Sequence, residues 1–535
     1  MKKTISLTII ILMVVQTMAA PLENRVKPRI VVNIVVGQMR YDYLLRFADN
    51  LSEKGFRYLI TNGSSCDRAQ LNYLTTSTPS GLATISTGAN PSTHGVIGNG
   101  RTNYTTGERT ELLKDDTVLT VGSDELDAQL SPKGLYASTI GDVIKTVSPE
   151  SRVISVAFEA ASAVIIGGFL PDAAYWVSPR DGRFVSNSYY MQQLPKWVQD
   201  FNATQVAEKY SSESWRVLRA AGSYHNIISR DIVRDSSSNF LNFDFLTRKK
   251  YDYDRLATSP AANTLLRDFA IQAIIYENLG KDDATDLINI VFDPSRKVGE
   301  KYGSQSMEVE DCFYRMDAEI ASFREFLETQ FGKEKVLLVV SSDHGAADPV
   351  TDHSRLPNGR FDTNQFAILM NGFLGAQLGG DQRWVLDFSD NQIYLDRRLI
   401  YEKGYDLNDI QDKVAAFAIQ FRGVAQAITS HSMSSGYFAG GVMGRAQNSY
   451  FPRHSGDVVL NLLPGWTVDN NKLSDSGSPY NYDTHIPLIW WGGMVGTQDV
   501  SREVSAEDIA PTIAHIIGIA PPNAATGRPI VDIYR

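Results

Sequence analysis

Short apolar runs rich in β-branched residues alternate along this chain with longer segments that carry apolar residues at helical spacing. A buried strand of a parallel sheet reads as such a continuous apolar run, and alternation with helices is typical of βαβ units. The pattern therefore predicts an α/β fold built on a doubly wound, mostly parallel sheet. The strand-like runs lie at 29–36, 152–160, 284–293, 335–345 and 486–493, and the clearest helical pattern lies at 306–331.

Two stretches interrupt this alternation. Residues 170–280 and 370–475 are richer in Tyr, Asn, Ser and Gly, and their periodicity is weaker. We interpret both as insertions that form a cap over the sheet edge of a single domain spanning 21–535. A chain of 535 residues that is 43% hydrophobic can bury a core large enough for such a domain.

The first 21 residues read MKKTISLTIIILMVVQTMAAP, with two lysines, a short apolar run and small residues at its end. This pattern predicts a secretory signal peptide over residues 1–20 and a secreted or periplasmic protein; the alternative is an uncleaved N-terminal anchor. The run is short for a spanning helix, and no later segment approaches one. Outside the cytosol a disulfide between Cys66 and Cys312 is permitted, but the sequence does not show whether they pair.

The charge balance bears on the class of partner. The net charge of −10 is opposite in sign to that of a typical nucleic-acid-binding protein. We therefore expect no nucleic acid among the partners, while the sequence does not indicate a protein partner or an oligomeric state.

Two polar residues stand at points that suit an anion. Thr78 precedes Pro79 at the start of a helical run, so we expect Thr78 to be the N-cap of that helix. Free N–H groups and a partial positive charge at a helix start can hold a phosphate or sulfate beside such a hydroxyl; the alternative is that Thr78 is only a cap. Asn99, in the turn-like stretch HGVIGNG, offers an amide to an anion.

Metal-ligand residue types follow or precede two of the predicted strands. Asp343 and His344 follow the run KVLLVVSS, and His485 directly precedes the run IPLIWW. Carboxylate oxygen and imidazole nitrogen are common zinc ligands. A lone His is more often structural, but a His and an Asp–His pair at two strand ends form a better constellation.

These stretches together resemble the alkaline phosphatase superfamily, in particular the periplasmic PafA-type bacterial alkaline phosphatases and, more distantly, the nucleotide pyrophosphatase/phosphodiesterases. The matching motifs include TGANPSTHGVIGN, SSDHGA and PYNYDTHIPL, in the same order. The resemblance implies a two-zinc site and a Thr nucleophile that forms a phosphoenzyme. Thr78 matches that nucleophile, Asn99 matches a phosphate-binding Asn, and three metal ligands are matched by Asp343, His344 and His485.

The chain departs from this family at the other metal positions. Gly37 stands where the family has a zinc-binding Asp at the end of the first strand. Arg296 and Glu300 stand where it has an Asp and, four residues later, a His. In a looser alignment, Glu159 and Ala161 replace a Lys and an Arg that bind the substrate phosphate, and Glu159 is expected to repel a phosphate dianion.

Three of the six expected metal ligands are thus replaced. A stable zinc site normally has three or four protein ligands, and a metal pair is needed to hold both the attacking and the leaving oxygen. We therefore expect at most one zinc ion, or none, in a secreted member of the family that is inactive or severely impaired. The alternative is an active zinc-dependent phosphatase or phosphodiesterase with an altered metal site.

Because residue 296 is a cation, the sequence also predicts what occupies the place of the missing metal ion. If the segment is helical, Arg296 and Glu300 lie one turn apart, and we expect Arg296 to pair with Glu300 and with the neighbouring Asp343. In one form of this hypothesis the ion pairs are purely internal. In the other, Arg296, Asn99 and the helix start at Pro79 hold a phosphate- or sulfate-bearing small molecule.

Overall fold

The computed structural model describes residues 26–123, 129–213, 215–226, 233–234, 241–243, 253–350, 357–380, 382–468 and 471–534. The signal peptide predicted over residues 1–20 lies outside these ranges. Within them, no helix combines the length and the apolar character needed to cross a bilayer. Cys66 and Cys312 are both buried and neither is in a disulfide.

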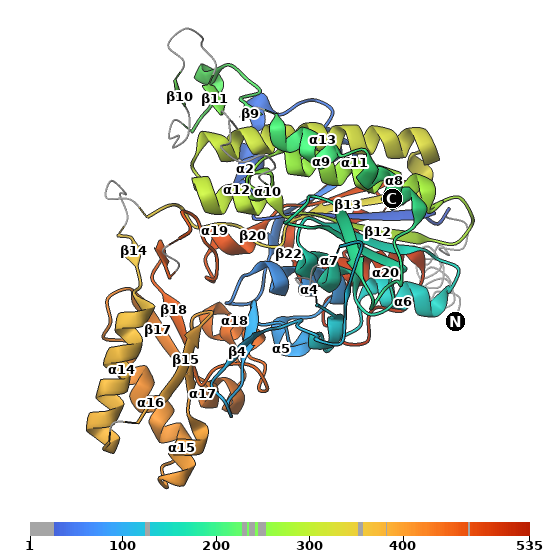
Figure 1. Cartoon of the computed structure of the whole chain (residues 1–535). Coiled ribbons are helices and arrows are strands. Elements are labelled where there is room, and N and C mark those ends of the chain that lie inside the picture. Colours follow the sequence, from blue (N-terminus) through green and yellow to red (C-terminus); the bar gives the residue numbers. More distant parts are fainter. Residues whose placement is uncertain are drawn as a thin grey trace, which may run out of the picture.

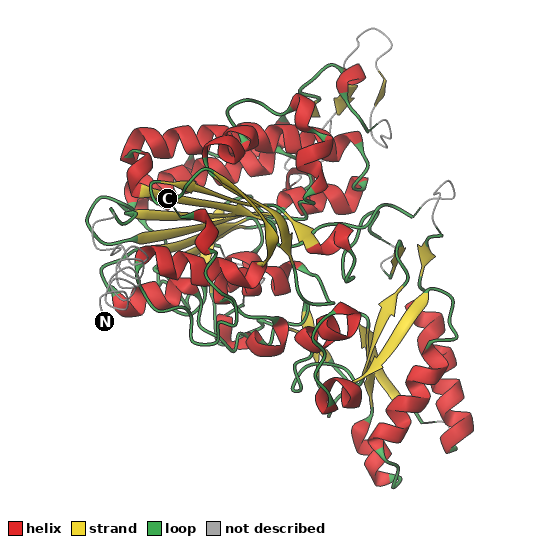
Figure 2. Cartoon of the chain, turned by 180° about the vertical axis from the view of Figure 1, so that it is seen from behind, coloured by secondary structure: helices red, strands yellow, loops and turns green. Residues whose placement is uncertain are grey.

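An eleven-stranded sheet forms the centre of the larger lobe, with helices on both of its faces (Figures 1 and 2). The strands follow the order β20-β2-β21-β13-β1-β12-β6-β7-β8-β5, and β22 pairs with β2. Their bounds are β1 Ile30–Val36, β2 Ser64–Gln70, β5 Thr120–Val121, β6 Val153–Ala157, β7 Ala173–Val177, β8 Phe184–Asn187, β12 Asp286–Phe292, β13 Val336–Ser341, β20 His485–Ile486, β21 Leu488–Gly492 and β22 Gln498–Ser505.

The middle of this sheet is parallel. β13, β1, β12, β6 and β7 run in one direction, whereas β21 is antiparallel to β13 and β8 is antiparallel to β7. Every residue of β1, β12 and β13 is buried, which is why these strands appear in the sequence as unbroken apolar runs. The predicted α/β class with a mostly parallel, doubly wound sheet is confirmed.

Successive residues of β1 belong to two different cores. Ile30, Val32 and Ile34 pack with the helices of one face, and Val31 and Val35 pack with those of the other. Figure 1 shows the two layers above and below the sheet. The upper layer includes α10 Tyr253–Ala257, α11 Ala261–Tyr276, α12 Pro294–Tyr302 and α13 Met307–Phe331, and the lower layer includes α4 Thr78–Thr87, α6 Ile140–Val147, α7 Ala160–Gly167 and α20 Ile509–Ile517.

Residues 359–468 fold around a separate apolar core in the smaller lobe. Its antiparallel sheet has the order β15-β16-β18-β17, and α14, α15 and α16 lie beside it (Figure 1). The insertion expected at 370–475 falls mostly in this lobe. The bounds are α14 Thr363–Leu378, β15 Val385–Ser389, β16 Gln392–Leu395, α15 Arg397–Glu402, α16 Leu407–Ala418, β17 Val424–Thr429 and β18 Val458–Leu462.

The stretch 170–280 is arranged differently from the expected cap. β7 and β8 extend the main sheet, and Phe269 of α11 belongs to the apolar core of its upper layer. Most of the described part of 170–280 is therefore part of the main lobe. The helices α8 Lys196–Ala203 and α9 Val206–Ser212 also belong to this stretch, and the polar residues lie largely in the turns between its elements.

Candidate functional site

The hydroxyl of Thr78 faces inward at the start of α4. The prediction that Thr78 is the N-cap was wrong: Ser77 has the extended backbone of a cap, with φ −150° and ψ 158°, and Thr78 is already the first helical residue. Because Thr78 is inside the first turn, its side chain is directed at the end of β13. There Thr78 Oγ1 lies 3.2 Å from His344 Nε2.

His344 is held in one orientation by the backbone. Its Nδ1 lies 2.6 Å from the carbonyl oxygen of Gly345, which can only accept, so Nδ1 carries a proton. In the neutral imidazole, Nε2 is then an acceptor and the hydroxyl of Thr78 donates to it. The pair thus presents a polarised hydroxyl at a buried position.

Asp343 lies directly behind this pair. Its Oδ1 accepts the backbone N–H of Gln38 and of His344, both at 2.8 Å. Its Oδ2 has no hydrogen-bond partner among the described residues and lies 3.6 Å from His344 Nε2. A fully buried carboxylate oxygen without a partner is costly. Thr78, His344 and Asp343 thus form one cluster of donor atoms in which one oxygen lacks a partner.

The loop after β1 contributes no metal ligand from position 37. Gly37 has no side chain, and a methyl group added there would lie 3.1 Å from Arg296 Cβ. Gln38 has the left-handed backbone conformation, with φ 58°, which aims its N–H at Asp343. Sequence reasoning missed this role of Gln38, since a non-glycine residue at positive φ has no clear sequence signal.

Arg296 lies beside Gly37 and, with Glu159 and Glu300, forms the ion-pair side of the pocket. Its Nη1 donates to Glu300 Oε1 at 2.7 Å, and its Nη2 donates to Glu159. Arg296 and Glu300 lie one turn apart on α12, so the predicted ion pair between them is confirmed. The expected pairing of Arg296 with Asp343 is not formed; Glu159 takes that place. Arg296 therefore holds two carboxylates that come from different elements.

Two lysines extend this ion-pair network. Lys297 Nζ lies 2.7 Å from Glu159 Oε1, and Lys472 Nζ lies 3.1 Å from Glu300 Oε1. Burial alone would raise the pKa of the Glu159 carboxyl, but Arg296 and Lys297 together lower that pKa to about 2. The expectation that Glu159 would act as a repelling charge is therefore corrected, because two cations neutralise it.

Asp293 fixes the backbone that carries Glu159. Its two carboxylate oxygens accept the backbone N–H groups of Phe158 and Glu159, each at 2.9 Å. These bonds fix the turn between β6 and α7 and so place the Glu159 side chain. Burial, and then the nearby Glu159 carboxylate, raise the pKa of Asp293 to about 7.

A cavity of about 260 Å³ lies between the Thr78–His344 pair and the ion-pair side formed by Glu159, Arg296 and Glu300. It brings together four of the residues predicted from the sequence: Thr78, Asn99, Arg296 and His344. Asn99 is solvent-exposed at the rim, and Lys472 and Asp475 close the side nearest the smaller lobe. Sequence reasoning did not identify Lys472, because its contact with Glu300 is long-range.

His485, which the resemblance matches to a ligand of the other zinc of the pair, does not line the Thr78 cavity. His485 Nε2 bonds the carbonyl oxygen of Asp67 at 2.8 Å, and its ring stacks on Tyr41 with centroids 4.2 Å apart. The register of β20 beside β2 sets this direction of the side chain. Throughout the described ranges, no group of three or more His, Cys, Asp or Glu side chains is arranged to hold a metal ion.

The two sides therefore differ in how well they fit a metal. Thr78 Oγ1, His344 Nε2 and Asp343 Oδ2 are three suitable donors, with one oxygen unpartnered. The opposite side presents a guanidinium and carboxylates that are already paired. The residues present can hold one zinc ion incompletely, and they do not fit a pair.

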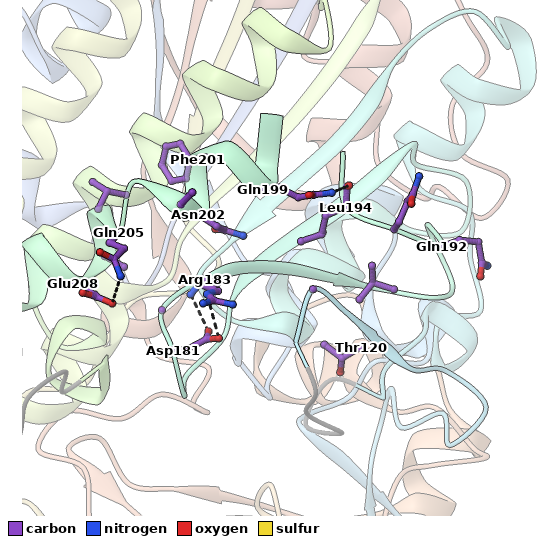
Figure 3. A pocket seen from close by; sticks show the side chains of 17 residues that line it. Thr120, Asp181, Arg183, Gln192, Leu194, Gln199, Phe201, Asn202, Gln205 and Glu208 are labelled. Carbon is purple, nitrogen blue, oxygen red and sulfur yellow. Dashed lines mark hydrogen bonds and ion pairs between the residues drawn. The ribbon is translucent and has the colours of Figure 1, made fainter. Parts of the chain in front are cut away.

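A second hollow, of about 640 Å³, opens on the surface beyond β8 (Figure 3). Five of the residues that line it carry amide side chains, and Arg183 and Asp181 pair across 3.7 Å. Neither His nor Cys is among the described residues that line it. The Thr78 cavity, although smaller, is therefore the candidate for chemistry.

Comparison with known proteins agrees with the geometry. The family model described as type I phosphodiesterase / nucleotide pyrophosphatase matches residues 31–487. The chain is 32% identical to a calcium-transporting ATPase of Myroides odoratus, over 95% of both chains. It is 30% identical to alkaline phosphatase PhoV of Synechococcus elongatus, over 95% of this chain and 93% of that protein.

Among solved structures, the crystal structure of wild-type alkaline phosphatase PafA superposes with a TM-score of 0.88 at 28% identity. The match covers 97% of this chain and 100% of that chain. The resemblance predicted from the sequence motifs therefore extends over nearly the whole fold, including both lobes.

Proposed function

The chain belongs to the type I phosphodiesterase / nucleotide pyrophosphatase family, and from that premise we propose that it is an exported member whose pocket has exchanged two-metal chemistry for an internal ion-pair network. In this proposal the protein hydrolyses phosphate esters very slowly or not at all. Export is supported by the N-terminal sequence pattern alone.

The observation that carries the proposal is the position of Arg296. Its guanidinium is buried and donates to both Glu159 and Glu300. A guanidinium keeps its charge at any pH a protein meets, so it cannot vacate the site by losing a proton. A divalent cation at the same place would be repelled by it and would lack free ligands.

The opposite side supports a limit of one metal ion. A zinc ion held by Thr78, His344 and Asp343 would supply a Lewis acid to one oxygen of a phosphate. Without zinc, His344 Nε2 accepts from the Thr78 hydroxyl; a zinc ion bound to Nε2 would take over that lone pair, and the hydroxyl would then be polarised by the metal. Without a second cation, the attacking and leaving oxygens are not both stabilised, and fast in-line displacement is not expected.

A phosphate- or sulfate-bearing small molecule remains the proposed ligand of the pocket. Both arms of Arg296 are engaged by carboxylates, so its main role in this proposal is the internal one. Asn99 at the rim, the start of α4 and the Nε–H of Arg296, which has no hydrogen-bond partner in the described chain, are the groups left to contact an anion. Slow hydrolysis through Thr78 is the second candidate function, favoured by the Thr78–His344 contact.

Metal content and hydrolysis rates test the proposal directly. We expect the purified protein to contain at most one zinc per chain and to cleave p-nitrophenyl phosphate and bis-p-nitrophenyl phosphate at rates close to the uncatalysed ones. Two zinc ions per chain, or turnover in the range of about 1 s⁻¹ or more that enzymes typically show, would overturn it.

A restoring variant sharpens this test. Gly37→Asp, Arg296→Asp and Glu300→His together return the family's ligand types to the ion-pair side, and we expect a second zinc to bind. The Cβ of an Asp at Gly37 requires its neighbours to shift by a few tenths of an ångström. Glu300→His alone is the matched control, because Arg296 remains in place and should still exclude the metal.

A further inference from the structure

Two helices of the lower layer begin at the wall of the Thr78 pocket. α4 starts after Ser77 and α7 starts after Glu159, and both of these residues line the cavity together with residues of the first turns that follow them. The two helices pack against each other below the sheet (Figure 1). Because the N-terminal end of a helix carries a partial positive charge, two such ends meet at one cavity.

Neither helix start is capped by the side chain of its own N-cap residue. Ser77 Oγ lies 3.0 Å from Ser80 Oγ and accepts no backbone N–H of α4. The Glu159 carboxylate is turned towards Arg296 and Lys297 and does not cap α7. For the N–H groups of residues 160–162, the described part of the chain provides no acceptor. These groups are therefore available to a ligand.

A buried hydroxyl group stands beside these N–H groups. Ser162, in the first turn of α7, is 2% exposed and lines the cavity. Its Oγ has no hydrogen-bond partner among the described residues, and unlike Thr75 Oγ1 it is not sealed from the cavity. A buried hydroxyl without a partner is costly, and an oxyanion in the cavity would accept from it. Ser162 thus indicates a ligand with acceptor oxygens independently of the helix ends.

The charges around the cavity limit the charge of that ligand. Four carboxylates line it, each within ion-pair distance of a cation, and the four cations balance them. The carboxylates are those of Glu159, Glu300, Asp390 and Asp475, and the cations are Arg109, Arg296, Lys297 and Lys472. Asp343, behind His344, adds a further negative charge. Each helix end is equivalent to about half a positive charge, so the two ends offset about one negative charge of a ligand.

From these features we propose that the first turns of α4 and α7, with Ser162 Oγ as a hydrogen-bond donor, bind an ester whose tetrahedral oxyanion carries a single negative charge. A sulfate monoester and a phosphodiester share this chemistry, whereas a phosphate monoester carries about 1.5 to 2 charges at neutral pH. The cavity of about 260 Å³ suits one aromatic ring beside the oxyanion, since about 150 Å³ takes up benzene. The inference rests on the proposed function, in which ion pairs and not a metal pair adjoin the ligand.

Three esters of p-nitrophenol test the charge of the ligand at pH 8. p-Nitrophenyl sulfate and methyl p-nitrophenyl phosphate carry one negative charge, and p-nitrophenyl phosphate carries about two. Binding to the full chain is measured by calorimetry with EDTA present, so that no zinc offsets the second charge. We expect at least one of the singly charged esters to bind about 5-fold or more tightly than p-nitrophenyl phosphate. The tighter of the two then distinguishes a sulfate ester from a phosphodiester as the ligand.

The variant Ser162→Ala tests the donor. It should weaken the binding of the favoured ester by about 10-fold or more, as expected for a hydrogen bond to a charged group. Thr75→Val is the matched control, because Thr75 also lines the cavity but its Oγ1 is sealed from it. Each variant removes an unsatisfied hydroxyl, so the thermal stability of the free protein should stay the same or rise. Unchanged binding in Ser162→Ala, or an equal loss in both variants, would overturn the proposal.

The variant Ala161→Lys tests the charge balance. Ala161 lines the cavity from the first turn of α7, so a lysine there adds a cation beside the oxyanion. The affinity for p-nitrophenyl phosphate relative to p-nitrophenyl sulfate should then rise by about 10-fold. In the uncharged control Ala161→Met, this ratio should equal that of the parent. An equal ratio in Ala161→Lys and Ala161→Met would contradict a site that selects its ligand by charge.

Failure of this proposal is distinguishable from failure of the proposed function. The proposal is wrong if p-nitrophenyl phosphate binds the EDTA-treated protein as tightly as both singly charged esters, or if none of the three binds up to its solubility limit. Two zinc ions per chain, or fast turnover without EDTA, would instead contradict the proposed loss of the metal pair. That result would leave the order of affinities measured with EDTA unchanged.

Discussion

The two sides of the Thr78 pocket differ in whether their charged groups have partners. On the Glu159 side, Arg296 joins two carboxylates, and each of these has a lysine as well. On the other side, the Oδ2 atom of Asp343 is buried with no partner in the described chain. One side is thus closed by charge pairing within the protein, whereas the other keeps a buried carboxylate oxygen without a partner.

The paired charges are thus confined to one side of the pocket, where a single guanidinium joins carboxylates from two elements. On the other side, Asp343 is held by the backbone N–H groups of Gln38 and His344 and not by Arg296. Perturbing each side separately should therefore give different responses.

The largest effect is expected for Arg296→Met. This change leaves Glu159 and Glu300 without their shared partner, and breaking a buried pair typically costs 3–5 kcal/mol. The Glu159 side chain is 31% exposed, so we expect a loss of about 2–4 kcal/mol in the free energy of unfolding, measured by chemical denaturation.

Arg502→Met is the control for that measurement. Arg502 pairs with Asp532 at 2.6 Å, but both side chains are at least 40% exposed, so the cost should stay below about 1 kcal/mol. If Arg296→Met costs no more than Arg502→Met, the ion-pair side contributes nothing special to the fold, and the contrast between the two sides fails.

The next largest effect concerns zinc and Asp343→Asn. The amide keeps an oxygen that can accept from Gln38 and His344, so without metal the variant should be as stable as the parent or slightly more stable. Zinc at about 100 times its Kd should stabilise the parent by about 2.7 kcal/mol. The variant should lose this stabilisation, as read from thermal unfolding with and without zinc.

His485→Asn serves as the counterpart, because His485 lies outside the pocket and bonds Asp67. Its zinc-dependent stabilisation should equal that of the parent. A loss of zinc binding in His485→Asn with no effect of Asp343→Asn would contradict the arrangement of donors described above.

These comparisons also show what sequence alone can predict. β1, β12 and β13 were predictable because strands buried on both faces are continuously apolar, and the Arg296–Glu300 pair was predictable because helical spacing is fixed. The motifs around Thr78 and His344 correctly placed both residues in one pocket.

Sequence could not predict the directions of particular side chains or the contacts between residues far apart in the chain. Ser77 rather than Thr78 is the N-cap of α4, because the helix begins one residue earlier than the preference of Pro for the first helical position suggests. His485 stands beside a central strand, but the register of β20 with β2 sets where its ring points. The contact between Lys472 and Glu300 spans more than 170 residues, so no local pattern indicates it.

A smaller effect is expected from pH. Folding lowers the pKa of Glu159 from its ordinary value of 4.5 to about 2: burial opposes this shift, and Arg296 and Lys297 outweigh it. A depressed carboxyl pKa adds stability above pH 4.5 and loses it as the pH falls towards 2. The parent should therefore exceed Glu159→Gln by about 1–2 kcal/mol at pH 6, with the difference shrinking at pH 3.

Denaturation of both proteins at the two pH values checks this directly, and taking their difference removes the contribution of other carboxyl groups. A difference that grows on acidification would mean that Glu159 is protonated in the folded protein. It would then be Arg296 and Glu300 alone that close the ion-pair side.

The smallest effect is expected for Lys472→Ala, which tests where the ion-pair side ends. Lys472 is the second partner of Glu300, but its side chain is 32% exposed and Glu300 keeps Arg296 when the lysine is removed. We expect a loss below about 1 kcal/mol, and because water and salt reach this pair, the loss should shrink further in 1 M NaCl. The cost of Arg296→Met should change much less with salt, since the guanidinium is only 13% exposed. A salt-independent loss above about 2 kcal/mol for Lys472→Ala would place the lysine inside the closed network, which would then extend to the wall nearest the smaller lobe.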